Sequence, residues 1–295
     1  MGLYLDRVAA RTRAVQTVLC LGMDPVPGSL PEGFRADLGG VERFCEVLLE
    51  AALPHVAAVK SNLAFFEAFG SEGLAALERL RARVPSDVPF IADAKRGDIG
   101  STSARHAMAL YDSLGCNAVT ASPYLGSEAI EPLLERADRF VYVLCRTSNP
   151  GAGELQGLEV GPDPTAGAPA EPLFARVARL AQGWGPGGTV GLVAGATAPA
   201  ELELIRRIAP GLALLVPGAG AQGGEIEPVL RHGPATAAPA GGVPGGGLLV
   251  NVSRGIAGAA TGVAGGAAGR GRPPDVADAL AEAARHWARV LRIPV

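Results

Sequence analysis

Lysine is nearly absent from this chain of 295 residues: only Lys60 and Lys95 are lysines among its 26 basic residues. Arginine is therefore used wherever a cation need only be solvated. An ammonium differs from a guanidinium because it is compact and can give up its proton. Both lysines also end apolar runs, V-A-A-V-K and F-I-A-D-A-K, which are typical of buried strands. We expect both lysines to be functional and not two leftover surface residues.

Cysteine is also scarce, and its spacing excludes two kinds of structure. The four cysteines form no C-x-x-C pair, which argues against a disulfide framework or a zinc site and favours reduced thiols in a cytosol. They are Cys20, Cys45, Cys116 and Cys145.

Basic surplus and long hydrophobic runs are missing as well. The formal net charge of −3 gives no sign of nucleic-acid binding. Asp6 and Arg7 interrupt the amino terminus too early for a signal peptide, and no charge-free hydrophobic run is long enough to span a membrane. We expect a cytoplasmic protein with neither nucleic acid nor membrane as partner.

Histidine offers no metal site. The four histidines fall on predicted helices or loops without ligand spacing, and no Ser/His/Asp or Cys/His set emerges. They are His55, His106, His232 and His286. We therefore expect no metal, and chemistry that depends on lysine and carboxylate.

Short apolar runs alternate with helical patterns along the chain, which predicts parallel strands covered on both faces. At this length the most economical closure is a (β/α)8 TIM barrel, with a doubly wound open sheet as the alternative. We expect one domain over residues 1–295, opened by a helix at 3–15. The predicted strands are 17–21, 56–60, 88–94, 118–121, 140–145, 189–193, 212–216 and 248–252.

The predicted helices follow the strands, and Ser101 or Thr102 could cap the helix that begins near 101. A long Gly/Pro-rich loop is expected from 147 to about 170. The Gly/Ala/Pro-rich stretches 233–247 and 258–271 are expected to be solvated, mobile loops. Besides 3–15, the helices are 42–53, 72–84, 101–114, 126–136, 173–181, 199–208, 225–231 and 275–291.

The stretch 89–102, P-F-I-A-D-A-K-R-G-D-I-G-S-T, gathers charge at the end of a predicted strand. Asp93 and Lys95 are two residues apart, so on a strand they face the same side. Asp98 follows in the turn. Two carboxylates and an ammonium therefore meet at a carboxyl end, where barrel enzymes place their active sites.

Polar residues at the other predicted strand ends complete one set. The chain has only four asparagines and four glutamines, yet four of these eight amides fall near strand ends, which favours a lined pocket. The set is Asp24, Lys60, Asn62, Asp93, Lys95, Ser122, Ser148, Asn149, Gln222, Asn251 and Arg254.

The last two strands end in Gly-rich turns, V-P-G-A-G-A-Q-G-G and N-V-S-R-G-I. Backbone amides freed by glycine, together with Arg254, can hold a phosphate, and barrels often bind one after strands seven and eight. We expect a phosphate cradle at this position.

Five motifs together resemble orotidine 5′-phosphate decarboxylase, in the form of the second bacterial subgroup of that family. They are V-K-S-N (59–62), D-A-K-R-G-D-I (93–99), T-S-N-P-G-A (147–152), V-P-G-A-G-A-Q-G-G (216–224) and S-R-G-I (253–256). The resemblance implies cofactor-free decarboxylation of orotidine 5′-monophosphate to uridine 5′-monophosphate, the last step of de novo pyrimidine nucleotide synthesis.

The resemblance also implies roles for the charged residues. Lys95 would protonate carbon six of the pyrimidine, and Asp93 would lie against the departing carboxylate. Asp98 would reach the site from the neighbouring subunit with Thr102, so that a homodimer shares its active sites. Lys60 would bond a ribose hydroxyl and hold Asp93.

The remaining implied residues bind the nucleotide. Asp24 would bind another ribose hydroxyl, Ser148 would contact the base, Gln222 would bridge base and phosphate, and Arg254 would hold the phosphate. The further implied binding positions are Asn62, Pro217, Gly218 and Gly255.

Other functions of the same barrel stay open at this stage. A Schiff-base aldolase needs a neutral lysine, which Asp93 and Asp98 beside Lys95 oppose. Magnesium-dependent sugar-phosphate decarboxylases and synthases share D-x-K-x-x-D but place a carboxylate where this chain has Lys60. A non-catalytic barrel that binds a phosphate ligand would tolerate loss of Lys95.

Overall fold

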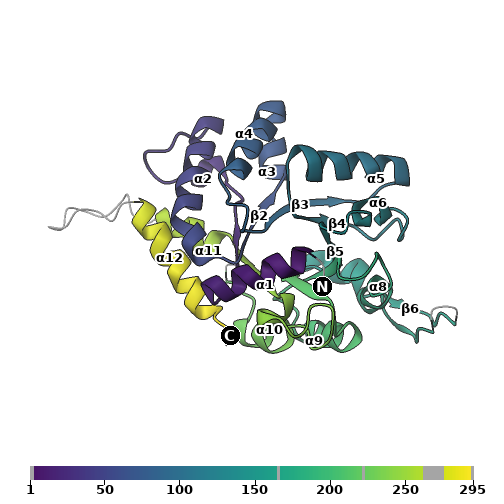
Figure 1. Ribbon diagram of the computed structural model, residues 1–295. Helices are drawn as coiled ribbons and strands as arrows, with labels where there is room; N and C mark the ends of the chain where they lie inside the picture. The colour runs from purple at the N-terminus through teal and green to yellow at the C-terminus, as the bar shows by residue number, and fades with distance from the viewer. Residues whose placement is uncertain (1–2, 165–166, 221–222, 262–275, 294–295) are drawn as a thin grey trace.

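Eight parallel strands close into a barrel in the computed structural model, in the order β1-β10-β9-β8-β5-β4-β3-β2 (Figure 1). The structure describes residues 3–164, 167–220, 223–261 and 276–293. The barrel strands are β1 (Leu19–Gly22), β2 (Ala58–Asn62), β3 (Phe90–Arg96), β4 (Ala118–Ala121), β5 (Phe140–Arg146), β8 (Val190–Ala194), β9 (Ala213–Val216) and β10 (Leu249–Val252). The predicted (β/α)8 barrel is confirmed, and each predicted strand lies within two residues of an observed one.

Helices surround the barrel, and α12 lies along the outside against α2 and α11 (Figure 1). Asp37 caps α2, because its side chain accepts the Gly40 N–H at 2.9 Å. The helices are α1 (Leu3–Val15), α2 (Leu38–Ala52), α3 (Ala64–Glu67), α4 (Gly70–Ala82), α5 (Gly100–Ala107), α6 (Glu131–Leu134), α7 (Gly153–Gln156), α8 (Leu173–Ala181), α9 (Pro199–Ile208), α10 (Ile226–His232), α11 (Arg254–Ala257) and α12 (Val276–Val290).

Two apolar clusters form the core, one between the barrel and its helices and one inside the barrel. Helix α1 closes the amino-terminal end of the inner cluster. Its Tyr4 ring stacks on Phe140 with ring centroids 4.6 Å apart, and its hydroxyl lies 3.3 Å from that of Tyr142. Because this floor is apolar and filled, polar chemistry is confined to the opposite end, where the strands finish.

The segment 233–247 corrects the expectation of a solvated, mobile loop. Ala240 is fully buried, and Ala235 belongs to the inner cluster. The 3₁₀ turn Pro244–Gly247 contacts α1. A Cβ on Gly247 would lie 2.8 Å from the Cβ of Ala213. Small residues here permit close packing beneath the barrel, which is why their composition resembled that of a loop. Of the stretch 258–271, residues 262–271 lie outside the described part.

Three further predictions, of a helix, a loop and a helix cap, also need correction. The helix expected at 126–136 is reduced to α6, because Pro132 fits only in the first helical turn. The expected loop 147–170 contains α7 and the strand β6 (Glu159–Val160), which pairs with β7 (Glu171–Pro172). Neither Ser101 nor Thr102 caps α5, because that helix already begins at Gly100.

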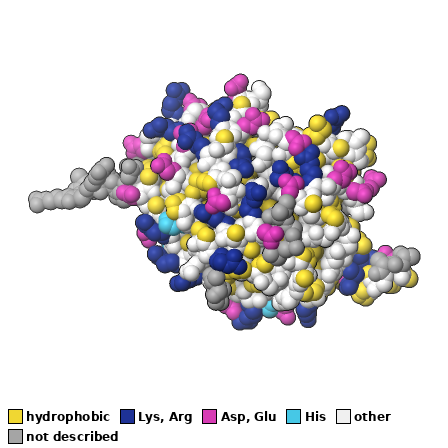
Figure 2. Space-filling model, viewed as in Figure 1, with side chains coloured by type: hydrophobic (Ala, Val, Ile, Leu, Met, Phe, Trp, Pro, Cys, Tyr) yellow, Lys and Arg dark blue, Asp and Glu magenta, His cyan; other side chains and the backbone are white. Residues whose placement is uncertain are grey.

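Basic and acidic side chains are interspersed on the face shown in Figure 2. Within the described ranges, none of the helices combines the length and the apolar character that crossing a membrane requires.

Candidate active site

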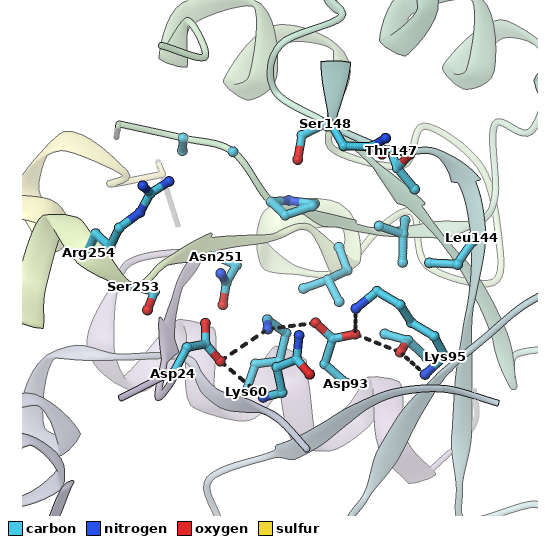
Figure 3. A pocket seen from close by; sticks show the side chains of 18 of the residues that line it. Asp24, Lys60, Asp93, Lys95, Leu144, Thr147, Ser148, Asn251, Ser253 and Arg254 are labelled. Carbon is cyan, nitrogen blue, oxygen red and sulfur yellow. Dashed lines mark hydrogen bonds and ion pairs between the residues drawn. The ribbon is translucent and has the colours of Figure 1, made fainter. Parts of the chain in front are cut away.

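Lys60, Asp93 and Lys95 form one hydrogen-bonded chain of charges inside the mouth of the barrel (Figure 3). Lys60 Nζ lies 2.9 Å from Asp93 Oδ2, and Lys95 Nζ lies 2.6 Å from Asp93 Oδ1. The Lys60 side chain is only 5% exposed, whereas that of Lys95 is 46% exposed. Both ammonium groups therefore line the pocket, but that of Lys60 is almost fully buried and that of Lys95 is half exposed.

Asp24 flanks the buried ammonium from β1's side of the barrel. Its Oδ1 lies 3.9 Å from Lys60 Nζ and accepts the Asn62 backbone N–H at 3.0 Å. The Asn62 side chain accepts the Ala64 N–H at 3.1 Å, so it also orders the start of α3. The second oxygen of Asp24 is left available to a ligand hydroxyl.

A bulge in β3 aims Lys95 into the pocket. Ala92 pairs with Val119 and Arg96 with Ala121, so β3 uses more residues than β4 over this stretch. Lys95 has a φ of +50°, a region that costs a side-chain-bearing residue about 1–2 kcal/mol. Strain of this kind persists only where neighbouring contacts fix the backbone.

Thr120 supplies such contacts and was missed from the sequence. Its Oγ1 accepts the Lys95 backbone N–H at 3.0 Å and donates to Asp93 Oδ1 at 2.9 Å. One hydroxyl thus fixes both the strained backbone of Lys95 and the carboxylate between the two lysines. The only signal in the sequence is a single polar residue in the apolar run A-V-T-A.

The pKa values of the buried pair follow from these contacts. Burial alone would raise the pKa of Asp93, but Lys60 and Lys95 outweigh it and lower that pKa to about 2. Burial opposes the charged form of Lys60, yet Asp24 and Asp93 outweigh it and raise the pKa of this lysine. Both groups are therefore ionised at neutral pH.

The pocket around these charges has a volume of about 530 Å³, a size suited to a nucleotide-sized ligand. Apolar side chains from three strands, Leu144, Val193 and Leu215, form part of its wall. Leu144 is labelled together with Lys95 in the close-up of the pocket (Figure 3). Sequence reasoning missed these three residues because they look like ordinary core positions of their strands.

The Gly-rich turns form the side of the pocket opposite Lys95 (Figure 3). Pro217 and Gly218 line it after β9, and Ser253 and Arg254 line it after β10. Gly218 has a φ of +92°, which turns the chain sharply after the strand. Arg254 is exposed, and none of the described residues forms an ion pair with it. Pro217, Gly218 and Arg254 thus line the side of the pocket where the sequence predicts a phosphate cradle.

Asn251, on β10, has a buried side-chain oxygen that lacks a hydrogen-bond donor among the described residues. The residue is 8% exposed and lines the cavity, yet no described residue donates a hydrogen bond to its buried Oδ1. A buried carbonyl oxygen without a partner costs about 1–3 kcal/mol. A donor on a bound ligand would remove that cost.

Thr147, Ser148 and Asn149 line the pocket from the loop after β5. The Thr147 backbone N–H donates to Gln156 Oε1 at 2.9 Å, so α7 holds the start of this loop. Gly195 lets the end of β8 approach Ser148, because a Cβ there would lie 2.9 Å from the Ser148 backbone.

Four of the predicted site residues, Asp98, Thr102, Ser122 and Gly255, do not line this pocket. Asp98 Oδ1 instead accepts the Ile99 backbone N–H at 2.7 Å. Gly255 follows Arg254 but is not part of the wall. Gln222 lies outside the described residues.

Across residues 3–164, 167–220, 223–261 and 276–293, no three or more His, Cys, Asp or Glu side chains are placed to hold a metal ion. The four cysteines are free and buried. Lys60, within β2, occupies the position where the magnesium-dependent sugar-phosphate enzymes place a carboxylate.

Comparison with known proteins points to one family. The model of the family described as "Orotidine 5'-phosphate decarboxylase / HUMPS family" matches residues 17–268. A protein of Roseiflexus castenholzii named "Orotidine 5'-phosphate decarboxylase" is 45% identical over 282 residues, which covers 95% of this chain and 97% of that protein. A protein of the same name from Thermomicrobium roseum is 45% identical over 255 residues, 86% of each chain.

Solved structures agree with the sequence relatives. The structure of Leishmania donovani OMP decarboxylase matches with a TM-score of 0.78 and 35% identity, covering 99% of this chain and 98% of that one. A Toxoplasma gondii structure titled putative orotidine-monophosphate-decarboxylase matches with a TM-score of 0.79 and 36% identity, covering 98% and 95%.

Proposed function

The chain belongs to the orotidine 5′-phosphate decarboxylase / HUMPS family, and we propose that it converts orotidine 5′-monophosphate to uridine 5′-monophosphate and carbon dioxide. This reaction is a step of pyrimidine nucleotide synthesis. The observation that carries the proposal is the Lys60–Asp93–Lys95 chain of charges, set across the pocket from Arg254.

The proposed chemistry breaks the bond between carbon six and the carboxylate. Carbon dioxide leaves, the electron pair stays on carbon six, and Lys95 Nζ donates a proton to that carbon. A fixed ammonium beside the developing carbanion is worth more in a closed pocket than in water. Because Lys95 is half exposed, it can regain its proton from solvent.

Asp93 has two tasks in this proposal. It holds both ammonium groups in place through its two oxygens, and it sets a negative charge next to the substrate carboxylate. The leaving carbon dioxide is neutral, whereas the substrate carboxylate is charged. The apolar wall of Leu144, Val193 and Leu215 therefore favours the product carbon dioxide over the carboxylate.

Nucleotide binding occupies the rest of the pocket. We assign the ribose hydroxyls to Asp24, Lys60 and the unpartnered oxygen of Asn251. The base is assigned to Ser148, and the phosphate to Arg254 with the turn at Pro217 and Gly218. Asn62 also lines the pocket and would contact the nucleotide. Gly255 would contribute its backbone, and Gln222 would bridge base and phosphate.

A second copy of the chain would complete the site. Large apolar side chains are exposed on the segment 98–108, which carries Asp98 and Thr102, with Ile99 at 59% and Met108 at 47%, and on the loop after β4, with Tyr124 at 76% and Leu125 at 48%. The two segments lie close together, because a Cβ on Gly97 would lie 2.6 Å from the Ser122 carbonyl oxygen. Exposed apolar patches of this kind favour a protein interface. A homodimer formed through this face would place Asp98 and Thr102 in its partner's pocket.

The direct test is an assay with orotidine 5′-monophosphate in the presence of a metal chelator, following the loss of orotate absorbance. The proposal expects uridine 5′-monophosphate and carbon dioxide in equal amounts, at a rate that chelator does not change. A rate that depends on added magnesium would favour the sugar-phosphate alternative. Borohydride trapping of a substrate on Lys60 or Lys95 would favour the aldolase.

A further inference from the structure

Trp287 of α12 contacts the Gly-rich turn after β10. Its Nε1–H donates to the Gly255 carbonyl oxygen at 3.1 Å. A Cβ on Gly255 would lie 2.8 Å from that same Nε1. The residue after Arg254 is therefore held against the indole ring, and only glycine fits there without displacing it.

The six-membered ring of the same indole reaches the turn after β9. A Cβ on Gly220 would lie 2.8 Å from Cη2 of Trp287 and 2.9 Å from its Cζ2. Gly220 also has a φ of +80°, so glycine is required here both by the backbone and by the ring.

One rigid side chain thus spans two turns that are about 35 residues apart in the sequence. Both turns line the phosphate side of the pocket, through Gly218 in one case and Arg254 in the other. The helix that carries Trp287 is itself fixed, since Leu280 and Ala284 are buried and α12 contacts α2 and α11. The distance between the turns is therefore set from outside the barrel.

We propose that Trp287 is a positioning residue for the phosphate cradle: its indole fixes the separation of the two turns that hold the nucleotide's phosphate. The inference rests on the proposed function, because it takes the phosphate to be that of orotidine 5′-monophosphate. Trp287 itself does not line the pocket. Its effect should therefore appear only for ligands that carry a phosphate.

The first experiment uses Trp287→Phe, which removes the Nε1–H donor and shortens the ring. The Kd of uridine 5′-monophosphate and the KM of orotidine 5′-monophosphate are expected to rise about tenfold, as loss of one or two good contacts does. The Kd of uridine should stay within about twofold, and kcat should fall less than about threefold.

Trp184→Phe is the matched control, because Trp184 is the other of the chain's two tryptophans and lines a different pocket with Ser127 and Glu131. This variant should match the unaltered protein in every constant. Equal losses of uridine and uridine 5′-monophosphate binding in Trp287→Phe, or a fall in kcat with KM unchanged, would overturn the proposal. If the unaltered protein fails to decarboxylate the substrate, the proposed function itself fails.

A second measurement holds even if Trp287→Phe does not fold. In Trp184→Phe, Trp287 is the sole tryptophan, so the emission of the protein reports on its surroundings. Uridine 5′-monophosphate and inorganic phosphate should both change this emission, and uridine should not. An emission that responds to uridine as strongly as to its monophosphate, or to neither phosphate ligand, would contradict the proposal.

Discussion

Asp93 Oδ1 accepts two hydrogen bonds, one from the Lys95 ammonium and one from the Thr120 hydroxyl. Thr120 also accepts the backbone N–H of Lys95, whose φ is positive. A hydrogen bond to a charged group is worth about 1.5–3 kcal/mol, so this hydroxyl contributes to the geometry of the pair that we propose to be catalytic.

Thr120→Val is expected to lower kcat by about tenfold or more, because it removes the hydroxyl while keeping the shape. Thr120→Ser should retain most of the activity. Thr189→Val is a matched control: Thr189 is equally buried, but its Oγ1 makes no hydrogen bond within the described part of the chain. If both valine variants lose activity equally, the hydroxyl of Thr120 has no special role.

The depressed pKa of Asp93 predicts a pH dependence of stability. Because the folded pKa is about 2 and the ordinary value is 3.8, the carboxylate stabilises the fold above pH 3.8 and loses this contribution as the pH falls towards 2. A shift of this size corresponds to on the order of 2 kcal/mol.

Asp93→Asn tests this dependence. Its Tm should lie below that of the unaltered protein at pH 6, and the gap should narrow as the pH falls from 4 to 2. Thermal unfolding followed by circular dichroism gives both values. A gap that is constant over this range would show that the ionisation of Asp93 does not stabilise the fold.

The charged residues of the site could be predicted from the sequence, whereas the residues that hold them in place by hydrogen bonds could not. Lys60, Asp93 and Lys95 were identifiable because lysine is rare in this chain and because they end apolar runs. Thr120 was not, because its partners depend on the register of β3 against β4 and on the bulge between them. Asp98 and Thr102 remain predictions that need a second subunit.

At the scale of elements, the strands were predictable because a strand buried on both faces appears as a continuous apolar run. Helix α6 was not, since its helical spacing concealed the limit set by Pro132. The segment 233–247 was misjudged because Gly and Ala favour both mobile loops and close backbone packing. Only the three-dimensional neighbours distinguish the two.

Gly247→Ala tests whether the segment 233–247 packs against the barrel. Gly247 and Gly242 both have positive φ, but a Cβ on Gly247 would meet Ala213 and Ala240, whereas a Cβ on Gly242 would meet nothing within 4 Å. Gly242→Ala should cost about 1–2 kcal/mol from the backbone alone. Gly247→Ala should cost at least about 1 kcal/mol more, from overpacking.

The free energies of unfolding of the two variants can be compared through their thermal midpoints in one buffer. The account expects Gly247→Ala to melt several degrees below Gly242→Ala. Equal midpoints would mean that the segment does not pack against the barrel floor in solution.

At the scale of the whole molecule, the proposed dimer predicts complementation between two inactive variants. Lys95→Ala lacks the proton donor, and Asp98→Ala lacks the residue proposed to act in the partner's pocket. A mixed dimer would contain one pocket with both residues. After unfolding and refolding together in equal amounts, the two variants should recover about a quarter of the normal activity, because half the dimers are mixed and each has one intact site.

Each variant refolded alone is the control and should stay inactive. Recovery only in the mixture supports a shared site. A mixture no more active than the separate variants would place the whole site within one chain, and activity of Asp98→Ala alone would remove Asp98 from the mechanism.

The central claim is that the Lys95 ammonium, fixed by Asp93, performs the chemical step. Its most direct test is to measure carbon dioxide release and uridine 5′-monophosphate binding in Lys95→Ala. The account predicts that carbon dioxide release falls at least about a hundredfold, in the range of about 10²–10⁴ typical of a lost proton donor, while the nucleotide still binds. Release within about tenfold of normal would contradict the account.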